Sequence, residues 1–329
     1  MNILVTGGAG YVGSHAARLL DRAGHTVWVY DNCWRGHRAA ALPGRLIEGE
    51  LADGAKLRTV LTGQRIDAVM HFAAVALVGE SVVDPALYYQ NNVVGSLSLL
   101  AAMRAAAVHK IVFSSTTAVY GAPGRIPITE AELCQPINPY GVTKRVVEQA
   151  LEAYRAAYGL GYVSLRYFNA AGASPAGDLG EDHEPETHLI PLVLAVALGQ
   201  RDKIVVFGDD YPTADGTCRR DYIHVDDLGL AHLKAIERLV PGEGHALNLG
   251  TGRGSSVWEV IQACRDVTGC AIPAEVGPRR PGDPPELVAD SSQAAAWLGW
   301  RPHYGTIHPI VETAWRWHRD HPHGYDDQT

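Results

Sequence analysis

The segment NPYGVTKRVVEQ (138–149) places Tyr140 and Lys144 four residues apart. Residues at this spacing share one face of a helix, so the phenol and the ammonium would lie close together. Asn138 is suited to cap such a helix and Pro139 suits its first turn, which puts Tyr140 near the positive end of the helix dipole. Because a nearby cation lowers the pKa of an acid, we expect Lys144 to favour the phenolate of Tyr140. A bare pair of this kind also arises by chance, so its surroundings must decide.

Residues 8–13, GAGYVG, form a glycine-rich turn between an apolar stretch and a segment with helical spacing. Together with Gly7 they also read GxxGxxG. Glycines in this position let the backbone and the amino end of a helix approach a pyrophosphate. Asp31 ends the next expected strand, where a carboxylate accepts a hydrogen bond from a ribose 2′-hydroxyl and repels a 2′-phosphate. The pattern predicts a dinucleotide site with NAD favoured over NADP.

Hydroxyl side chains follow another expected strand, in FSSTTAVYG. Ser114, Ser115 and Thr116 would lie at its carboxyl end, where active sites of doubly wound sheets are found. Thr116 could orient the substrate oxygen that Tyr140 deprotonates, and a bound nicotinamide cation would further favour the phenolate. A hydroxyl, a tyrosine, a lysine and NAD together indicate oxidation of an alcohol by hydride transfer.

The elements that must position these residues alternate along the chain. Strand-like stretches begin at residues 1, 25, 65, 109 and 161, and helix-like stretches lie between them, including 91–108 and 142–159. This alternation predicts an α/β fold, a Rossmann-type doubly wound parallel sheet, over residues 1–169. Residues 170–188 read as a long loop, and the remainder as a smaller C-terminal α/β substrate lobe, 170–329. The segment 220–240 regains strand–helix character, so we expect it to return to the NAD-binding domain.

The composition limits the classes of partner. The 329 residues are 47% apolar and 19% charged, with a net charge of −8, so we expect a large core and neither nucleic acid nor an anionic membrane as partner. Five scattered cysteines without CxxC argue against a disulfide framework or zinc site, and the fifteen histidines show no HExxH spacing, so we expect no metal. The first residues read as a strand rather than a signal peptide, and the longest apolar stretch, 189–198, is too short to span a membrane. We therefore expect a cytoplasmic protein.

The motifs also support a family assignment. Nearly from end to end, the chain resembles the extended short-chain dehydrogenases/reductases and, within them, the UDP-glucose 4-epimerases. The motifs that carry this resemblance include VTGGAGYVGSH, YDN, YYQNNVVGSLSLL, FSSTTAVYG, PYGVTK, RYFNAAGASP, GDLGEDH, HLIP, RRDYIHVDDL, NLGTG, RRPGD and HPHGY. The resemblance implies that the tyrosine removes the proton of the sugar 4-hydroxyl while C4 gives a hydride to NAD. A transient 4-keto sugar turns over and takes the hydride back on its other face.

The resemblance also implies roles for particular positions. The catalytic set is Thr116, Tyr140 and Lys144. The NAD set comprises Gly7, Gly10, Tyr11, Val12, Gly13, Asp31, Asn32, Glu50, Leu51, Phe72, Ala73, Ala74, Asn91, Ser114, Tyr140, Lys144 and Phe168. The set for the UDP-sugar substrate comprises Thr116, Asn169, His188, Leu189, Phe207, Arg220, Arg280, Asp283 and Leu287. The arginines also make sense unaided, since guanidinium groups bind a diphosphate well.

Four positions depart from the pattern of the family. Glu50 stands where many members have Asp, and can still accept from the adenine amino group. Ala76 replaces a lysine that contacts the cofactor phosphates in some members, and His188 stands where some have Asn. Leu287 occupies a position that is often Tyr in members restricted to glucose and galactose, so we hypothesise room for a 2-acetamido group.

Other readings remain open at this point. A 4,6-dehydratase would have carboxylates after the hydroxyl, where this chain has Thr117 and Ala118. Asp31 disfavours an NADPH-dependent reductase, and a non-catalytic NAD sensor would be expected to lose Tyr140 or Lys144. A UDP-glucuronate 4-epimerase stays possible. The resemblance further implies a homodimer through the two long helices, and it leaves open which UDP-sugar is preferred.

Overall fold

The computed structural model describes residues 1–280 and 283–326. Its largest feature is a parallel sheet of seven strands in the order β10-β6-β5-β4-β1-β2-β3. The strands are β1 (Asn2–Thr6), β2 (Thr26–Asp31), β3 (Leu46–Glu48), β4 (Ala68–His71), β5 (Lys110–Ser114), β6 (Gly161–Tyr167) and β10 (Gly244–Leu249). This sheet confirms the expected α/β fold of Rossmann type.

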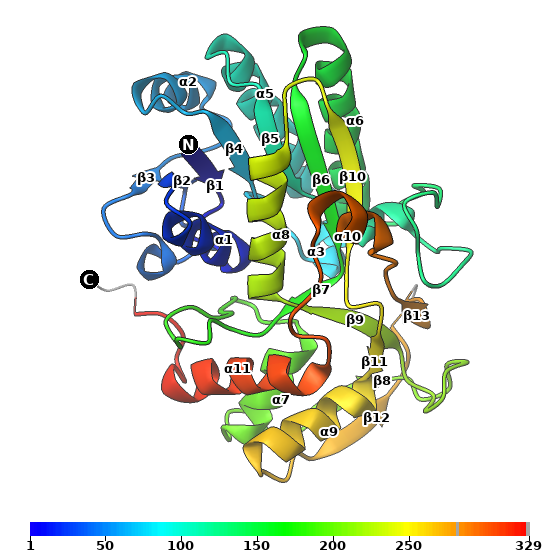
Figure 1. Cartoon of the computed structure of the whole chain (residues 1–329). Coiled ribbons are helices and arrows are strands. Elements are labelled where there is room, and N and C mark those ends of the chain that lie inside the picture. Colours follow the sequence, from blue (N-terminus) through cyan, green and yellow to red (C-terminus); the bar gives the residue numbers. More distant parts are fainter. Residues whose placement is uncertain (281–282, 327–329) are drawn as a thin grey trace.

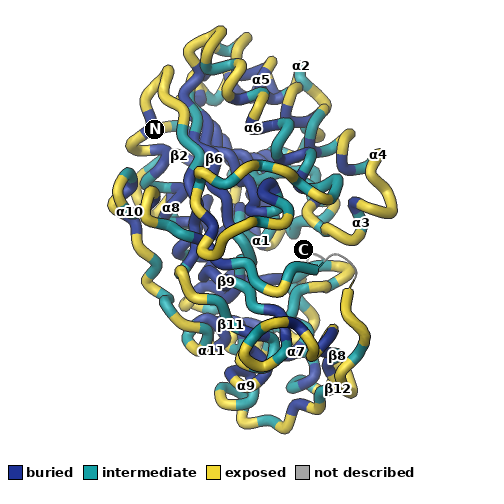
Figure 2. Tube along the Cα trace, turned by 90° about the vertical axis from the view of Figure 1, so that its right-hand side faces the viewer, coloured by how far each residue is buried: buried dark blue, intermediate teal, exposed yellow. Residues whose placement is uncertain are grey.

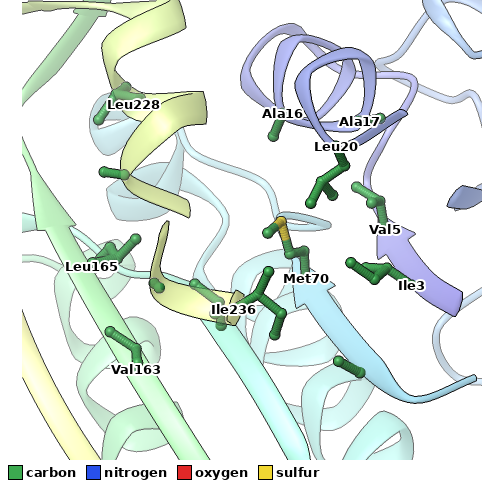
Figure 3. Close-up of a cluster of buried hydrophobic side chains, with 14 of the residues drawn as sticks. Ile3, Val5, Ala16, Ala17, Leu20, Met70, Val163, Leu165, Leu228 and Ile236 are labelled. Carbon is green, nitrogen blue, oxygen red and sulfur yellow. The ribbon is translucent and has the colours of Figure 1, made fainter. Parts of the chain in front are cut away.

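Helices cover both faces of this sheet (Figure 1). One face carries α1 (Tyr11–Arg22) and α8 (Val225–Arg238), and the other carries α2 (Gly54–Gly63), α5 (Gly95–Ala105) and α6 (Pro139–Tyr158). Because side chains alternate along a strand, Ile3 and Val5 of β1 pack toward α1 and α8, and Leu4 joins the other layer (Figure 3). The central strands β1, β4, β5 and β6 are mostly buried, whereas the edge strand β3 is partly exposed and the other exposed segments lie mainly on the surrounding helices and loops (Figure 2).

The expected long helix over 91–108 is divided. Short helices α3 (Val78–Val83) and α4 (Pro85–Tyr88) precede a π-helical turn, η2 (Tyr89–Val94), and α5 continues from it. The Asn92 side chain bonds both backbone groups of Val75, and Ser96 donates to the Asn92 carbonyl oxygen. These bonds compete with the regular hydrogen-bond pattern of an α-helix. The hydrophobic periodicity of the sequence alone does not reveal them.

A second group of elements forms the lobe beneath the sheet. A four-stranded sheet contains β7 (Asn169–Ala171), β9 (Arg219–His224), β11 (Gly254–Ser256) and β13 (Glu286–Leu287), and β8 (Ile204–Phe207) pairs with β12 (Ala274–Gly277). Helices α7 (Leu189–Ala197), α9 (Val257–Thr268) and α11 (Ile307–Asp320) pack together over a separate apolar core. The expected loop over 170–188 contains neither helix nor strand after β7.

The segment 220–240 divides between the two parts. Strand β9 belongs to the lobe sheet, whereas α8 packs on α1 and on the large sheet. The chain stays at the large sheet through β10, against which α10 (Ser292–Leu298) packs. No helix of the described residues is long and apolar enough to cross a membrane.

Candidate functional site

The carboxyl ends of four neighbouring parallel strands define the site. β1 ends at the glycine turn, β4 leads to Phe72-Ala73-Ala74, β5 ends at Ser114, and β6 leads to Phe168. The Phe72 and Ala73 amides both donate to the carbonyl oxygen of Thr6, which holds the second turn against the first. Neighbouring strand ends thereby bring together residues that are far apart in the sequence.

The glycine turn has the geometry of an anion cradle. Gly7 has a φ of +75°, and a Cβ there would lie 2.4 Å from the Ala73 amide nitrogen. A Cβ on Gly13 would lie 2.1 Å from the Gly7 carbonyl oxygen, whereas one on Gly10 would meet nothing closer than 3.4 Å. Gly10 caps α1 without any side-chain hydrogen bond, so the amino end of this helix is open to a phosphate. These features fit the pyrophosphate of a dinucleotide.

Asp31 joins the glycine turn to the second strand. Its Oδ2 accepts from the Ala9 amide at 3.0 Å and its Oδ1 from the Cys33 amide at 2.9 Å. Burial raises the pKa of this carboxyl, and the backbone bonds oppose that rise. Next to it, the side-chain amide group of Asn32 donates to the Glu50 carboxylate at 3.1 Å. The carboxylate that would select a ribose 2′-hydroxyl is therefore held by the same loop that would hold the phosphates.

The remaining residues of the expected cofactor set lie around these. Val12 and Phe72 pack on the core beneath α1, Phe72 stacks on His232 with ring centroids 4.6 Å apart, and Leu51 packs on the opposite core. Asn91 donates to the Leu87 carbonyl oxygen, one turn back on its own helix. The Tyr11 hydroxyl donates to the Gly172 carbonyl oxygen at 2.6 Å and so ties the glycine turn to the loop after β7.

The predicted reactive trio is brought together at the start of α6. The Asn138 side chain accepts from the Gly141 amide at 2.8 Å, which is the expected cap. The Lys144 Nζ lies 5.9 Å from the Tyr140 ring centroid, and Tyr140 shares a side-chain hydrogen bond with Thr116. Thr116 itself begins a short 3-10 turn, η3 (Thr117–Tyr120), where its hydroxyl accepts from the Ala118 amide at 3.1 Å.

Burial dominates the electrostatics of this trio. Burial raises the pKa of Tyr140 to about 12, and the hydrogen bond with Thr116 only partly opposes it. Burial also lowers the pKa of Lys144 to about 7, although Glu148 opposes that change. Without a bound cofactor, desolvation therefore favours the neutral phenol, and the expectation that Lys144 and a bound nicotinamide cation make the Tyr140 phenolate accessible stays a prediction. A further positive charge beside Tyr140 is needed.

A buried polar network that sequence reasoning missed supports the trio from below. Arg166 and Glu148 form a bidentate ion pair with nitrogen–oxygen distances of 2.8 and 2.7 Å, and the Ser115 hydroxyl donates to Glu148 at 2.7 Å. Arg166 also donates to the Tyr120 hydroxyl, which donates to Asn248. The only sequence signal was the presence of an arginine in an otherwise apolar strand.

The expected substrate residues fall into two groups. Arg220 pairs with Asp283, and the Arg280 guanidinium lies 4.2 Å from the centroid of the Phe207 ring. Leu287 is opposite Arg220 in the lobe sheet and, like Phe168, packs against the small apolar cluster that contains Val119 and Tyr120 of η3, the turn that follows Thr116. Within the RRPGD motif, Pro281 and Gly282 lie outside the described residues.

The second group stands at the boundary between β7 and α7. Asn169 is paired with Tyr222 in the lobe sheet, and Leu189 begins α7. The His188 side chain does not simply cap α7. Its Nδ1 lies 2.6 Å from a carboxylate oxygen of Glu181 instead. The expected substrate role of His188 therefore competes with a contact inside its own loop.

The chain is similar over its whole length to known proteins. The family model "NAD dependent epimerase/dehydratase family" matches residues 3–250. A UDP-glucose 4-epimerase from Halalkalibacterium halodurans is 54% identical over 329 residues, which cover 100% of this chain and 98% of the relative. The chain belongs to the NAD-dependent epimerase/dehydratase family, as fold and site together indicate.

Two solved structures narrow this assignment. UDP-glucose 4-epimerase from Brucella ovis in complex with NAD is 50% identical, with a TM-score of 0.92 and coverage of 95% of this chain and 97% of that one. The enzyme from Bifidobacterium longum in complex with NAD+ and UDP is 39% identical, with a TM-score of 0.94 and coverage of 99% and 100%. Within its family the chain falls among the UDP-glucose 4-epimerases, which confirms the resemblance, and its cofactor is NAD.

Proposed function

We propose that the protein interconverts UDP-glucose and UDP-galactose, and UDP-hexose C4 epimers more generally. One arrangement carries this proposal: the hydroxyl of Thr116, which follows β5, and the hydroxyl of Tyr140, in the first turn of α6, interact in front of Lys144 at the same edge of the sheet as the glycine turn. This is the position from which a proton can be taken from a sugar hydroxyl next to a bound nicotinamide.

Three parts of the sheet edge would together form the NAD site. The glycine turn and the amino end of α1 would hold the pyrophosphate, and Asp31 the adenosine ribose. Asn32, Glu50 and Leu51 lie where an adenine ring would follow. When bound, NAD takes a hydride from C4 of the sugar and returns it.

Proton transfer falls to the protein itself. Tyr140 removes the proton of the 4-hydroxyl and later gives it back, and Thr116 orients the oxygen from which the proton leaves. Since the pKa of Tyr140 is about 12 in the protein alone, its phenolate depends on cations brought close to it. Lys144, with a pKa of about 7, is positioned to be one of them.

The nucleotide would be held by the lobe. The Arg220 and Arg280 guanidinium groups suit a diphosphate, and Phe207 offers an aromatic face beside them. Asn169, Leu189 and Asp283 belong to the same proposed site. Binding energy from this remote group holds the substrate while the keto sugar turns over. We place the substrate lobe at 170–329, apart from α8, β10 and α10, and the NAD-binding domain at 1–169.

A product assay tests the function. We expect the purified protein to carry NAD and to interconvert UDP-galactose and UDP-glucose. The products are separated by chromatography. UDP-glucuronate and UDP-xylose serve as comparison substrates, and the relatives give no support to glucuronate as the preferred one. Failure of NAD-loaded protein to interconvert the two hexoses would contradict the proposal.

The sugar range is a separate question, which concerns Leu287. Its position beside Phe168 and η3 is where a bulky side chain would narrow the sugar site. We therefore expect turnover of UDP-N-acetylglucosamine, and we expect Leu287→Tyr to reduce it at least tenfold more than turnover of UDP-glucose. Undetectable turnover of the N-acetylated sugar by the wild-type protein would refute this part.

The proposal extends to assembly and location. Exposed apolar side chains gather on the helices from α3 to α5, and these suit a homodimer interface: Val78, Val82, Val83, Tyr89, Val94 and Leu97. Light scattering after gel filtration tests for a dimer of about twice the chain mass. None of the five cysteines forms a disulfide, as in reducing compartments, which supports a cytoplasmic location that cell fractionation can test.

A further inference from the structure

A cluster of metal-ligand side chains lies in the loop between β7 and α7. The loop carries Glu181, His183, Glu186 and His188, spaced as Glu-x-His-x-x-Glu-x-His. Each residue offers one ligand atom, and these atoms lie within 4.8 Å of one another. The expectation of no metal rested on the absence of CxxC and HExxH spacings, which does not exclude this repeated Glu-x-His pair.

The distances in the cluster suit a tetrahedral cation. His183 Nδ1 lies 3.4 Å from Glu181 Oε1 and 3.5 Å from Glu186 Oε2, and His188 Nδ1 lies 3.4 Å from Glu186 Oε1. Ligands about 2.0–2.1 Å from zinc in a tetrahedron are separated by about 3.3 Å. One edge is shorter, at 2.6 Å between His188 Nδ1 and Glu181 Oε1. The 3.4 Å contact of His188 is with Glu186 Oε1 rather than Oε2, and the four ligand atoms lie within 4.8 Å of one another, so more than one side chain must shift to bring all four onto one cation.

Three of the converging atoms lack hydrogen bonds. Among the described residues, Glu181 Oε1, His183 Nδ1 and His188 Nδ1 are buried without a partner of acceptable hydrogen-bond geometry. The Glu181 side chain is only 4% exposed, so water does not compensate it. Buried polar atoms without a partner are rare and need an explanation, such as an ion. All three atoms belong to the group whose ligand atoms lie within 4.8 Å of one another.

The fourth ligand is held in place by the backbone. The Glu186 Oε1 accepts from the Thr187 amide at 2.6 Å and from the His188 amide at 2.7 Å, which leaves its Oε2 directed toward His183. Outer contacts of this kind orient carboxylate ligands in metal sites. The site therefore has four donors, two of nitrogen and two of oxygen, on a loop that is already bent around them.

We propose that Glu181, His183, Glu186 and His188 bind a divalent cation of the zinc type in tetrahedral coordination. Imidazole nitrogen and carboxylate oxygen are zinc donors, and the two carboxylates balance the charge of the cation. With four protein ligands the site is closed, which is typical of structural rather than catalytic zinc. The competing arrangement is a pair of protonated imidazoles between the same two carboxylates, with no metal.

The position of the cluster indicates what such a cation would do. The loop lies between α1 and α11, and the ring of His183 is 6.1 Å from the ring of Tyr11 in the glycine turn (Figure 1). The same loop is tied to α1 by the ion pair between Arg18 and Asp178. His188 directly precedes α7, the first helix of the substrate lobe. A bound cation would rigidify this loop, which already contacts α1 through the Arg18–Asp178 ion pair and the Tyr11 ring.

Metal binding to the full-length protein tests the site. Protein freed of metal by a chelator is titrated with Zn²⁺ alone by calorimetry and with Co²⁺ by visible absorption. We expect one equivalent of Zn²⁺ and the intense absorption bands of tetrahedral Co²⁺. The double variant His183→Ala/His188→Ala is expected to bind Zn²⁺ at least 100-fold more weakly. The control variant His308→Ala/His323→Ala alters two exposed histidines and is expected to bind Zn²⁺ with the affinity of the wild-type protein.

Several results would overturn the proposal. These are no Zn²⁺ binding by the wild-type protein, only the weak bands of octahedral Co²⁺, or unchanged affinity in the 183/188 variant. Circular dichroism checks that the variant is folded, and Glu181→Gln gives a second, near-isosteric test that is expected to weaken binding at least tenfold. Because the readout is metal binding, the result does not depend on whether UDP-sugars are epimerised.

Discussion

Lys144 donates a 2.8 Å hydrogen bond from its Nζ to the carbonyl oxygen of Ser114, the last residue of β5. This bond joins the helix that carries Tyr140 to the strand that precedes Thr116. The Nζ also lies 4.9 Å from the centre of the Phe113 ring. The ammonium is thus held at one place behind the reactive hydroxyls, at the cost of removing it from water, which lowers its pKa to about 7.

Replacing this lysine is expected to separate stability from activity. In the unfolded chain the lysine pKa is about 10.4, so below pH 7 the wild-type protein carries the full penalty of a buried charge. Lys144→Met should therefore raise the free energy of unfolding by about 1–3 kcal/mol at pH 6. The gain should shrink as the pH rises toward about 10.4, where the lysine is neutral in both states. Epimerase activity should fall at least 100-fold.

Urea unfolding of cofactor-free protein between pH 6 and 10 measures this difference. A loss of stability in Lys144→Met at pH 6 would show that the bonds to Ser114 and Phe113 outweigh desolvation. Lys110→Met, which alters a lysine at the other end of β5, serves as control and should change stability little at any pH.

Tyr140→Phe removes the phenolic proton acceptor and leaves the ring in place. We expect kcat to fall by about 10²–10⁴, the usual contribution of a general acid–base group, with NAD content unchanged. Steady-state kinetics and extraction of the bound nucleotide measure both quantities. Activity within tenfold of the wild-type value would contradict the assignment of Tyr140 as the base.

Thr116→Val is expected to shift the pH dependence of the same step. The Thr116 hydrogen bond lowers the pKa of Tyr140 against the effect of burial, so its loss should raise that pKa. The rising limb of the kcat profile, where the phenolate forms, should then move to higher pH. If kcat falls while the pH of the rising limb is unchanged, Thr116 only orients the sugar and does not set the pKa of Tyr140.

Asp31→Asn tests the cofactor site. The single side-chain oxygen of Asn could accept from only one of the Ala9 and Cys33 amides, and its NH2 group would face the other amide or the ribose hydroxyl, both of which are donors. Hydrogen bonds to charged groups contribute about 1.5–3 kcal/mol, so NAD affinity should fall by about 10–100-fold. Calorimetry on cofactor-free protein gives the constants, with the exposed Asp266→Asn as control. Equal NAD affinity in Asp31→Asn and wild type would count against the proposed ribose contact.

Local patterns predicted the parts of the site that depend on neighbouring residues. The glycine turn, the Asn138 cap, the position of Tyr140 in the first turn of its helix and that of Thr116 after a strand all follow from short-range rules, and the structure has them. The pKa of Tyr140 did not follow, because burial is a sum over the whole fold. Periodicity likewise missed the π-helical turn at Asn92, whose side chain bonds residues far along the chain.

The role of His188 shows the same limit. The family resemblance implied a substrate contact for His188, whereas in the folded loop its imidazole lies against Glu181, seven residues earlier. The interval between the two residues contains no regular structure, so no period predicts that they meet. Contacts inside irregular loops depend on turns that the sequence specifies only weakly.

The ion pair between Glu148 and Arg166 allows a comparison within one helix. Both side chains are at most 5% exposed, whereas Glu152, one turn further along α6, pairs with Arg155 at the surface and is 50% exposed. Glu148→Gln leaves the Arg166 charge uncompensated in the interior and should cost about 3–5 kcal/mol. Glu152→Gln should cost no more than about 1 kcal/mol, because water screens the surface pair.

Denaturant unfolding of both variants, monitored by circular dichroism, measures the difference. Ser115, the residue before Thr116, donates a hydrogen bond from its hydroxyl to Glu148. Glu148→Gln should therefore also lower kcat, whereas Glu152→Gln should not. If the two variants lose equal stability, the interior pair is no more stabilising than a surface pair. The buried network would then position the strand end without contributing to the stability of the fold.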